Sequence, residues 1–85
     1  MHELSIAQDI VATVIRHLPP DNRGPVRWVR LSVGAHNHFT SDSLRFCFEA
    51  ASEGTVLEGA KLEIDETLGD EIRVVEFELD DRRFP

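Results

Sequence analysis

The residues best suited to chemistry stand at the beginning of the sequence, Met1-His2-Glu3. A histidine beside a free terminus brings an imidazole, an amine and backbone amide nitrogens into one short stretch. Two chelates are open: the amine with the His2 amide and imidazole, or that imidazole with the amides of His2 and Glu3. Both need amide nitrogens that have lost their protons, which Ni(II) and Cu(II) promote and Zn(II) promotes poorly. The stretch therefore predicts a Ni(II) or Cu(II) site with a fourth position open.

Two further histidines, His36 and His38, lie in a polar loop that follows a predicted strand. Residues two apart in an extended loop project to the same side. The pair could bind a metal together or supply the fourth ligand of the His2 site; otherwise both are solvated loop residues. His17 is expected to act only as a cation near a helix end, and Cys47 as a buried thiol.

The length and composition limit which classes of protein this chain can belong to. The chain has 85 residues, which predicts a single domain over 1–85, and its net charge of −7 argues against a nucleic-acid partner. No apolar run approaches the roughly 20 residues of a membrane span. One cysteine and no recognisable signal peptide favour a cytoplasmic location. No nucleophile beside a base and no phosphate-binding loop is present, so an enzyme is not expected.

The first half of the chain predicts a helix, a strand and a second helix. Ser5 and Gln8 fit a capping box at the start of the first helix. Its apolar positions follow at helical spacing: Ala7, Ile10, Val11, Val14, Ile15 and Leu18. Val26–Val33 alternates as a strand does. The second helix is expected to begin at Asp42 or Ser43 and to close at Gly54.

The second half predicts two strands, Ala60–Ile64 and Ile72–Leu79. The apolar parity of the last strand shifts between Val74 and Phe77, which indicates a bulge or burial on both faces. The short turn at 67–70 predicts that these two strands form an antiparallel hairpin. The expected fold is α+β, in the order α-β-α-β-β, with two amphipathic helices packed on one face of a small three-stranded mixed sheet.

Several segments, taken in order, resemble the HypA family of hydrogenase and urease nickel incorporation proteins. The resemblance covers almost the whole chain and rests on Met1 to Ser5, Val29 to Gly34, Leu44 to Glu49, Gly54-Thr55, Glu58 to Ile64 and Glu71 to Leu79. It implies a nickel metallochaperone that delivers Ni(II) to a nickel enzyme during maturation, with nickel–iron hydrogenase the expected recipient. It also implies metal binding by His2 and Glu3, with Met1 supplying the terminus.

The same resemblance implies partners. They are the hydrogenase large subunit or another nickel enzyme and a HypB-like GTPase; a homodimer is also compatible with it.

Two features depart from the family pattern. HypA proteins carry a zinc domain with two CxxC motifs between the second and third strands, whereas here only Asp65 to Asp70 lies there and Cys47 is the single cysteine. Since structural zinc needs about four Cys or His ligands, none is expected. His36 and His38 also stand where family members have an acidic residue and small residues. These departures keep an alternative open, a metal-independent protein-interaction module built on the HypA fold.

Overall fold

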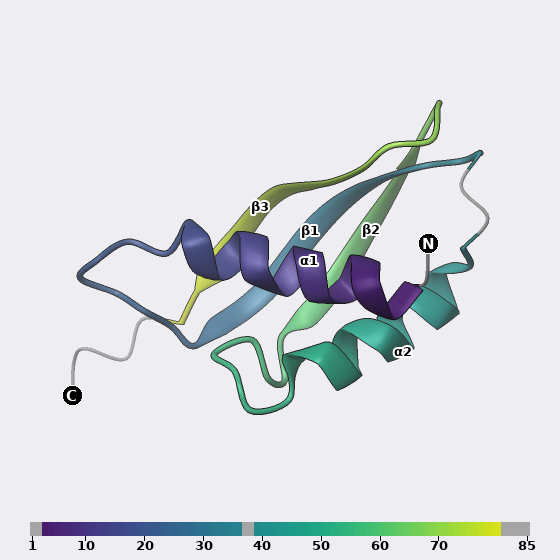
Figure 1. Cartoon of the computed structure of the whole chain (residues 1–85). Coiled ribbons are helices and arrows are strands. Elements are labelled where there is room, and N and C mark those ends of the chain that lie inside the picture. Colours follow the sequence, from purple (N-terminus) through teal and green to yellow (C-terminus); the bar gives the residue numbers. More distant parts are fainter. Residues whose placement is uncertain (1–2, 37–38, 81–85) are drawn as a thin grey trace.

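The computed structural model describes residues 3–36 and 39–80 (Figure 1). Its elements are α1 (Glu3–Arg16), β1 (Val26–Gly34), α2 (Ser41–Ser52), β2 (Lys61–Thr67) and β3 (Ile72–Leu79). Both helices lie on one face of the three-stranded sheet, where they contact each other, and α1 also contacts β3. The predicted α+β class and the predicted order of elements are confirmed.

The sheet has the strand order β2-β1-β3, with β1 in the centre. β1 runs parallel to β2 and antiparallel to β3. The predicted hairpin of the last two strands is therefore wrong. The connection from β1 through α2 returns the chain parallel to β1 on one side, and the short turn after β2 then carries it past the end of β1 to the other side.

The core lies between the helices and β1. Alternate residues of β1 are buried toward the helices, namely Val29, Leu31 and Val33. The helices contribute Ala7, Ile10, Val11, Val14, Leu44 and Phe48. The matching residues of β3 are only half-buried and pack at the margin of this core: Ile72, Val74, Phe77 and Leu79. The core side of β1 is thus fully covered by the helices, whereas the core side of β3 is only partly covered.

The helix starts differ from prediction. α1 begins at Glu3, so Ser5 lies inside its first turn and does not cap it. Thr40, rather than Asp42 or Ser43, caps α2: its backbone is extended (φ −85, ψ 155) and its Oγ1 accepts the Ser43 N–H at 3.1 Å. A cap must stand just outside the helix with extended backbone, and Thr40 is the residue that meets that requirement.

Gly34 ends β1 directly beneath the turn between β2 and β3. The N–H groups of Gly34 and Ala35 donate to the carbonyls of Glu71 and Thr67, both at 2.7 Å. A Cβ on Gly34 would lie 2.3 Å from the Gly69 carbonyl oxygen, so the close approach of the two backbones requires glycine. The turn is therefore fixed across the tip of the central strand.

The parity shift in β3 is a bulge. Arg30 lies opposite Glu76, but the next residue of β1, Leu31, lies opposite Val74, so Val75 is the extra residue. Val75 is accordingly exposed, whereas Val74 and Phe77 stay on the core side. This confirms the bulge that the sequence pattern indicated.

Candidate functional site

The predicted metal-binding residues fall partly within the structure. Met1, His2 and His38 lie outside the described residues, whereas Glu3 and His36 lie within them. The geometry of the candidate site is therefore defined by what surrounds the first residue of α1 and by the start of the histidine loop.

Glu3 is held at the junction of the two helix starts. Its carboxylate accepts a hydrogen bond from the hydroxyl of Ser43, in the first turn of α2. Both side chains are half-buried. As the first helical residue, Glu3 has a backbone N–H among the four that lack an acceptor within the helix. The fold thus fixes the position of Glu3 while leaving its amide nitrogen free of helical hydrogen bonds.

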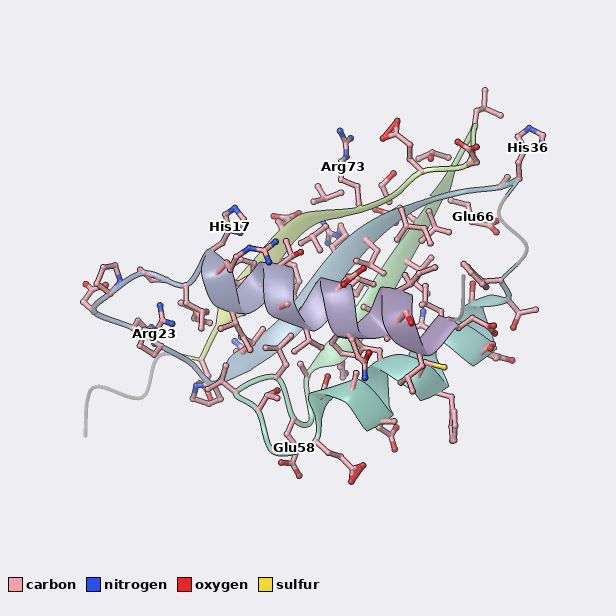
Figure 2. The ribbon with its side chains drawn as sticks, viewed as in Figure 1. His17, Arg23, His36, Glu58, Glu66 and Arg73 are labelled. Carbon is pink, nitrogen blue, oxygen red and sulfur yellow. The ribbon has the colours of Figure 1, made fainter. Side chains whose placement is uncertain are left out.

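His36 is positioned by the turn between β2 and β3. Its backbone N–H donates to the Gly69 carbonyl at 2.9 Å. The side chain is exposed and projects at the tip of the sheet, beyond the end of β1 (Figure 2). No contact between His36 and Glu3 is present, so these two predicted residues are not brought together by direct interaction within the described ranges.

The loop that leaves β1 past His36 returns to the fold at Thr40, three residues before Ser43. Phe39, Thr40 and Glu66 line a small hollow between this loop and the end of β2. Figure 2 shows Glu66 at the same end of the molecule as His36. Both ends of the loop are consequently anchored, one to the 67–71 turn and the other to the helix start that binds Glu3.

Ser43 and Glu66 were not among the predicted site residues. Ser43 was considered only as a helix cap, and nothing local in the sequence indicates that its hydroxyl meets a residue 40 positions away. Glu66 belongs to an acidic stretch that suggested a solvated surface. Its place beside the loop follows from the register of β2 against β1, in which Glu66 lies opposite Val33.

Residues 3–36 and 39–80 contain no group of three or more His, Cys, Asp or Glu side chains arranged to hold a metal. His17 lies near the opposite end of α1 from Glu3, and its Nδ1 is 2.8 Å from the Thr13 carbonyl oxygen. Cys47 is partly buried and packs against the core. Neither residue contacts Glu3 or His36 in the contacts described for residues 3–36 and 39–80.

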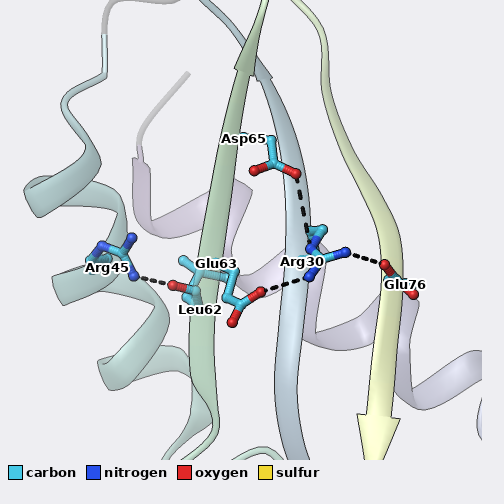
Figure 3. Close-up of polar contacts among 6 residues, drawn as sticks. All are labelled: Arg30, Arg45, Leu62, Glu63, Asp65 and Glu76. Carbon is cyan, nitrogen blue, oxygen red and sulfur yellow. Dashed lines mark hydrogen bonds and ion pairs between the residues drawn. The ribbon is translucent and has the colours of Figure 1, made fainter.

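The sheet face away from the helices carries a charge network centred on Arg30 (Figure 3). The guanidinium contacts Glu63 at 3.0 Å, Asp65 at 3.9 Å, and Glu76. It also lies 5.2 Å from the ring centre of Trp28. The hydrogen bond to Glu63, together with the charges of Glu76, Glu63 and Asp65, raises the pKa of Arg30.

Sequence comparison identifies the family. The profile described as "Hydrogenase/urease nickel incorporation, metallochaperone, hypA" matches residues 1–75. The chain belongs to the HypA family. The predicted resemblance is confirmed, and the family description names a metallochaperone, which agrees with the expectation that the chain is not an enzyme.

Curated HypA relatives are similar over most of this chain. Hydrogenase maturation factor HypA of Methylocella silvestris is 43% identical over 82% of this chain and 62% of its own length. The protein of the same name from Rippkaea orientalis is 49% identical over 81% of this chain and 58% of its own length. The chain thus spans about three fifths of the length of the relatives it matches.

A solved structure has the same fold. The solution structure of the Ni metallochaperone HypA from Helicobacter pylori superposes with a TM-score of 0.77 at 16% identity. The superposition covers 93% of this chain and 97% of that chain. Within residues 3–36 and 39–80, neither helix is long and apolar enough to cross a membrane.

Proposed function

We propose that this HypA-family chain is a nickel metallochaperone that binds one Ni(II) at its N-terminus and delivers it during maturation of a nickel enzyme. The observation that carries the proposal is the anchoring of Glu3, at the head of α1, by Ser43. In this proposal residues 1–85 act as one nickel-binding unit, without structural zinc, and the 67–71 turn occupies the place of the family's zinc domain.

The chemistry follows from the position of Glu3 in the helix. Its amide nitrogen can lose a proton without breaking a helical hydrogen bond, because the first N–H groups of a helix have no internal acceptor. The helix dipole also favours negative charge at this end. The His2 imidazole and the amides of His2 and Glu3, or the Met1 amine with the His2 donors, then supply three nitrogen ligands suited to planar Ni(II).

The fourth position is open to His36 or His38, or to a ligand from outside the chain. His36 belongs to a loop whose far end returns at Thr40, close in sequence to the Ser43 that binds Glu3. A site at a chain terminus suits transfer, since an incoming protein can displace one donor at a time. The recipient in this proposal is the large subunit of nickel–iron hydrogenase, with a HypB-like GTPase as a cooperating partner.

The test is a calorimetric Ni(II) titration of untagged protein that retains Met1. Wild type is expected to bind one Ni(II), and His2→Ala should lose that binding. A variant with four residues added before Met1 separates the amine from His2, so its loss of binding would assign the amine chelate and retained binding would assign the chelate that uses the amides of His2 and Glu3. His17→Ala is the matched control, because this histidine lies near the opposite end of α1, and it should bind as wild type does. Equal binding by all four proteins would refute the terminal site and favour the His36/His38 loop, whereas binding by none would favour a metal-independent interaction module.

Two measurements refine the same experiment. Affinity should fall as the pH is lowered, because imidazole and amide donors must both be deprotonated to bind the ion. His36→Ala and His38→Ala identify the fourth ligand: the variant that changes the visible absorption spectrum of bound Ni(II) removes it. If neither variant changes the spectrum, the fourth ligand comes from elsewhere and the loop histidines are excluded.

A further inference from the structure

The two edges of the sheet differ in how far the rest of the fold covers them. At the β2 edge, α2 lies alongside, and the Arg45 guanidinium donates to the carbonyl of Leu62 (Figure 3). Another strand would need that carbonyl as an acceptor, so the arginine opposes pairing there. β3 forms the other edge and pairs with β1 on one side only. The β3 edge is therefore the one at which a further strand can be added.

The core side of β3 is apolar and only partly covered by α1. Its half-buried side chains are those of Ile72, Val74, Phe77 and Leu79. Two hollows lie between α1 and β3, and Thr13 and Val74 line both of them. The hollows therefore form one groove along the edge, which reaches Ile72 at one end and Phe77 at the other. Natural edge strands are commonly protected by a charge on the inward side, and these four positions carry none.

The backbone of β3 presents unused hydrogen-bonding groups at the same four positions. Just outside the strand, the Glu71 carbonyl accepts from Gly34 at one end and the Asp80 N–H donates to Pro25 at the other. Because strand residues alternate in direction, the two core-side residues nearest each end then face away from β1. All four direct an N–H and a carbonyl to the side on which the described part of the chain has no further strand.

The bulge at Val75 leaves the edge usable along its whole length. β1 passes the bulge as a regular strand, with Leu31 opposite Val74 and Val29, two residues earlier, opposite Phe77. A regular strand on the outer side can meet the four core-side positions in the same way, with every second residue. About seven residues of an added strand are therefore enough to span β3.

Arg73 supplies a charge that selects among such segments. Its exposed side chain points away from the molecule (Figure 2), and it makes no ion pair within residues 3–36 and 39–80. The carboxylates of Glu76 and Glu78, further along β3, are already paired with Arg30 and Arg27. An acidic residue is thus the favoured neighbour of Arg73 on an added strand.

We infer that β3 is the docking site for an extended segment of a partner protein, which pairs antiparallel with it as a fourth strand. The segment carries apolar side chains at alternate positions, which fill the groove beside α1, and an acidic side chain opposite Arg73. Antiparallel pairing is the more stable arrangement per residue. In strand addition the backbone hydrogen bonds provide affinity, and the alternate side chains provide specificity. The inference does not rest on the nickel site and is tested separately from it.

The probe is a synthetic peptide, acetyl-Val-Thr-Val-Thr-Val-Glu-Val-amide, N-methylated at both threonines and at the glutamate. These methyl groups block the edge that faces away from β3, so the peptide cannot pair with itself. The matched control is N-methylated at its last three valines instead, which removes N–H groups directed at β3. At about ten times the Kd of the first peptide, hydrogen exchange of the four core-side amides of β3, followed by NMR, should slow by about tenfold. The control peptide should leave it unchanged.

Charge reversal tests the contact with Arg73. Arg73→Glu should weaken binding of the first peptide by about threefold or more, because it sets two carboxylates opposite each other. Lysine in place of the peptide's glutamate should restore the lost affinity. Lys61→Glu, an exposed site on the β2 edge, is the matched control and should bind as wild type does.

Several results would overturn the inference. They are no binding of the first peptide, equal binding of both peptides, or protection of amides in β2 instead of β3. Slow exchange of the four β3 amides before any peptide is added would also overturn it, since the edge would then already be covered by the chain itself or by a second copy.

Discussion

The hydrogen bond between Glu3 and Ser43 links the starts of the two helices. Glu3 is separated from the core residue Ala7 by a single helical turn, so its position follows that of the buried face of α1. Ser43 lies beside Leu44, which is buried in the same way on α2. This hydrogen bond therefore fixes the position of Glu3 relative to the buried residues of both helices.

Removal of the Ser43 hydroxyl should loosen this junction. Ser43→Ala is expected to lower the free energy of unfolding by about 1 kcal/mol, since a half-buried hydrogen bond to a carboxylate is lost. If Ni(II) binds at the terminus, its affinity should fall as well, because the ligands are less well positioned. Urea denaturation and calorimetry measure the two effects.

The control for this variant is Ser41→Ala, two positions earlier on an exposed site of the same helix turn. It should change neither stability nor nickel affinity appreciably. A Ser43→Ala protein that matches it in both measurements would show that the Glu3 contact has no positioning role.

The sequence predicts candidate site residues but could not predict the contacts that hold them. The terminal chelate stays a prediction from Met1-His2-Glu3, which the sequence alone could make because all its donors are adjacent in the chain. The Glu3–Ser43 contact spans 40 positions and depends on how α1 and α2 cross, which no local pattern specifies. For the same reason, the anchoring of His36 by Gly69 could not be predicted.

At the scale of elements, periodicity located each helix and strand, and β3 was predicted with its observed bounds. The ends of α1 and α2 were less well predicted, because serine and threonine occur at several neighbouring positions and only the backbone conformation selects the cap. The hairpin was wrong for a different reason. A short connection normally joins adjacent antiparallel strands, but here the parallel pairing of β1 with β2 leaves only the far side of β1 for β3.

The crossing of the turn over β1 makes Gly34 intolerant of any side chain. Gly34→Ala would set a methyl group 2.3 Å from the Gly69 carbonyl oxygen and close to the Asp70 nitrogen. Since both are backbone atoms of a hydrogen-bonded turn, relief requires moving the turn. We expect a loss of about 1–3 kcal/mol in the free energy of unfolding.

Chemical denaturation followed by circular dichroism measures this loss. Ser32→Ala, two residues earlier and directed to the open face, should stay within about 0.5 kcal/mol of wild type. A Gly34→Ala protein as stable as Ser32→Ala would mean that the turn does not pack against the end of β1 in solution.

At the scale of the whole molecule, acidic side chains outnumber basic ones and the net charge is −7. On the open face of the sheet, the carboxylates of Glu63, Asp65 and Glu76 surround the guanidinium of Arg30. All these groups are solvent-exposed, so each ion pair alone contributes little. The shared cation matters because it separates three carboxylates that would otherwise repel one another.

Arg30→Gln should therefore destabilise the protein in a salt-dependent way. The melting temperature is expected to fall relative to wild type at low ionic strength, and the difference should shrink in high salt as the carboxylates are screened. Arg16→Gln, which removes an exposed cation bonded only to Thr13 among its described contacts, is the control. A deficit that is the same at both salt concentrations would assign the role of Arg30 to packing against Trp28 instead.

Because the turn between β2 and β3 crosses the end of β1, this fold can also accept a domain inserted between these two strands. β2 and β3 are separated by one intervening strand, so a chain inserted near Leu68 would leave and re-enter the sheet about 10 Å apart. Independently folded domains commonly have termini that close together. Leu68 is 94% exposed, so such a graft would displace nothing from the core while Gly69 stays against Gly34. It would stand beside His36, where its own side chains could complete or shield whatever that histidine binds.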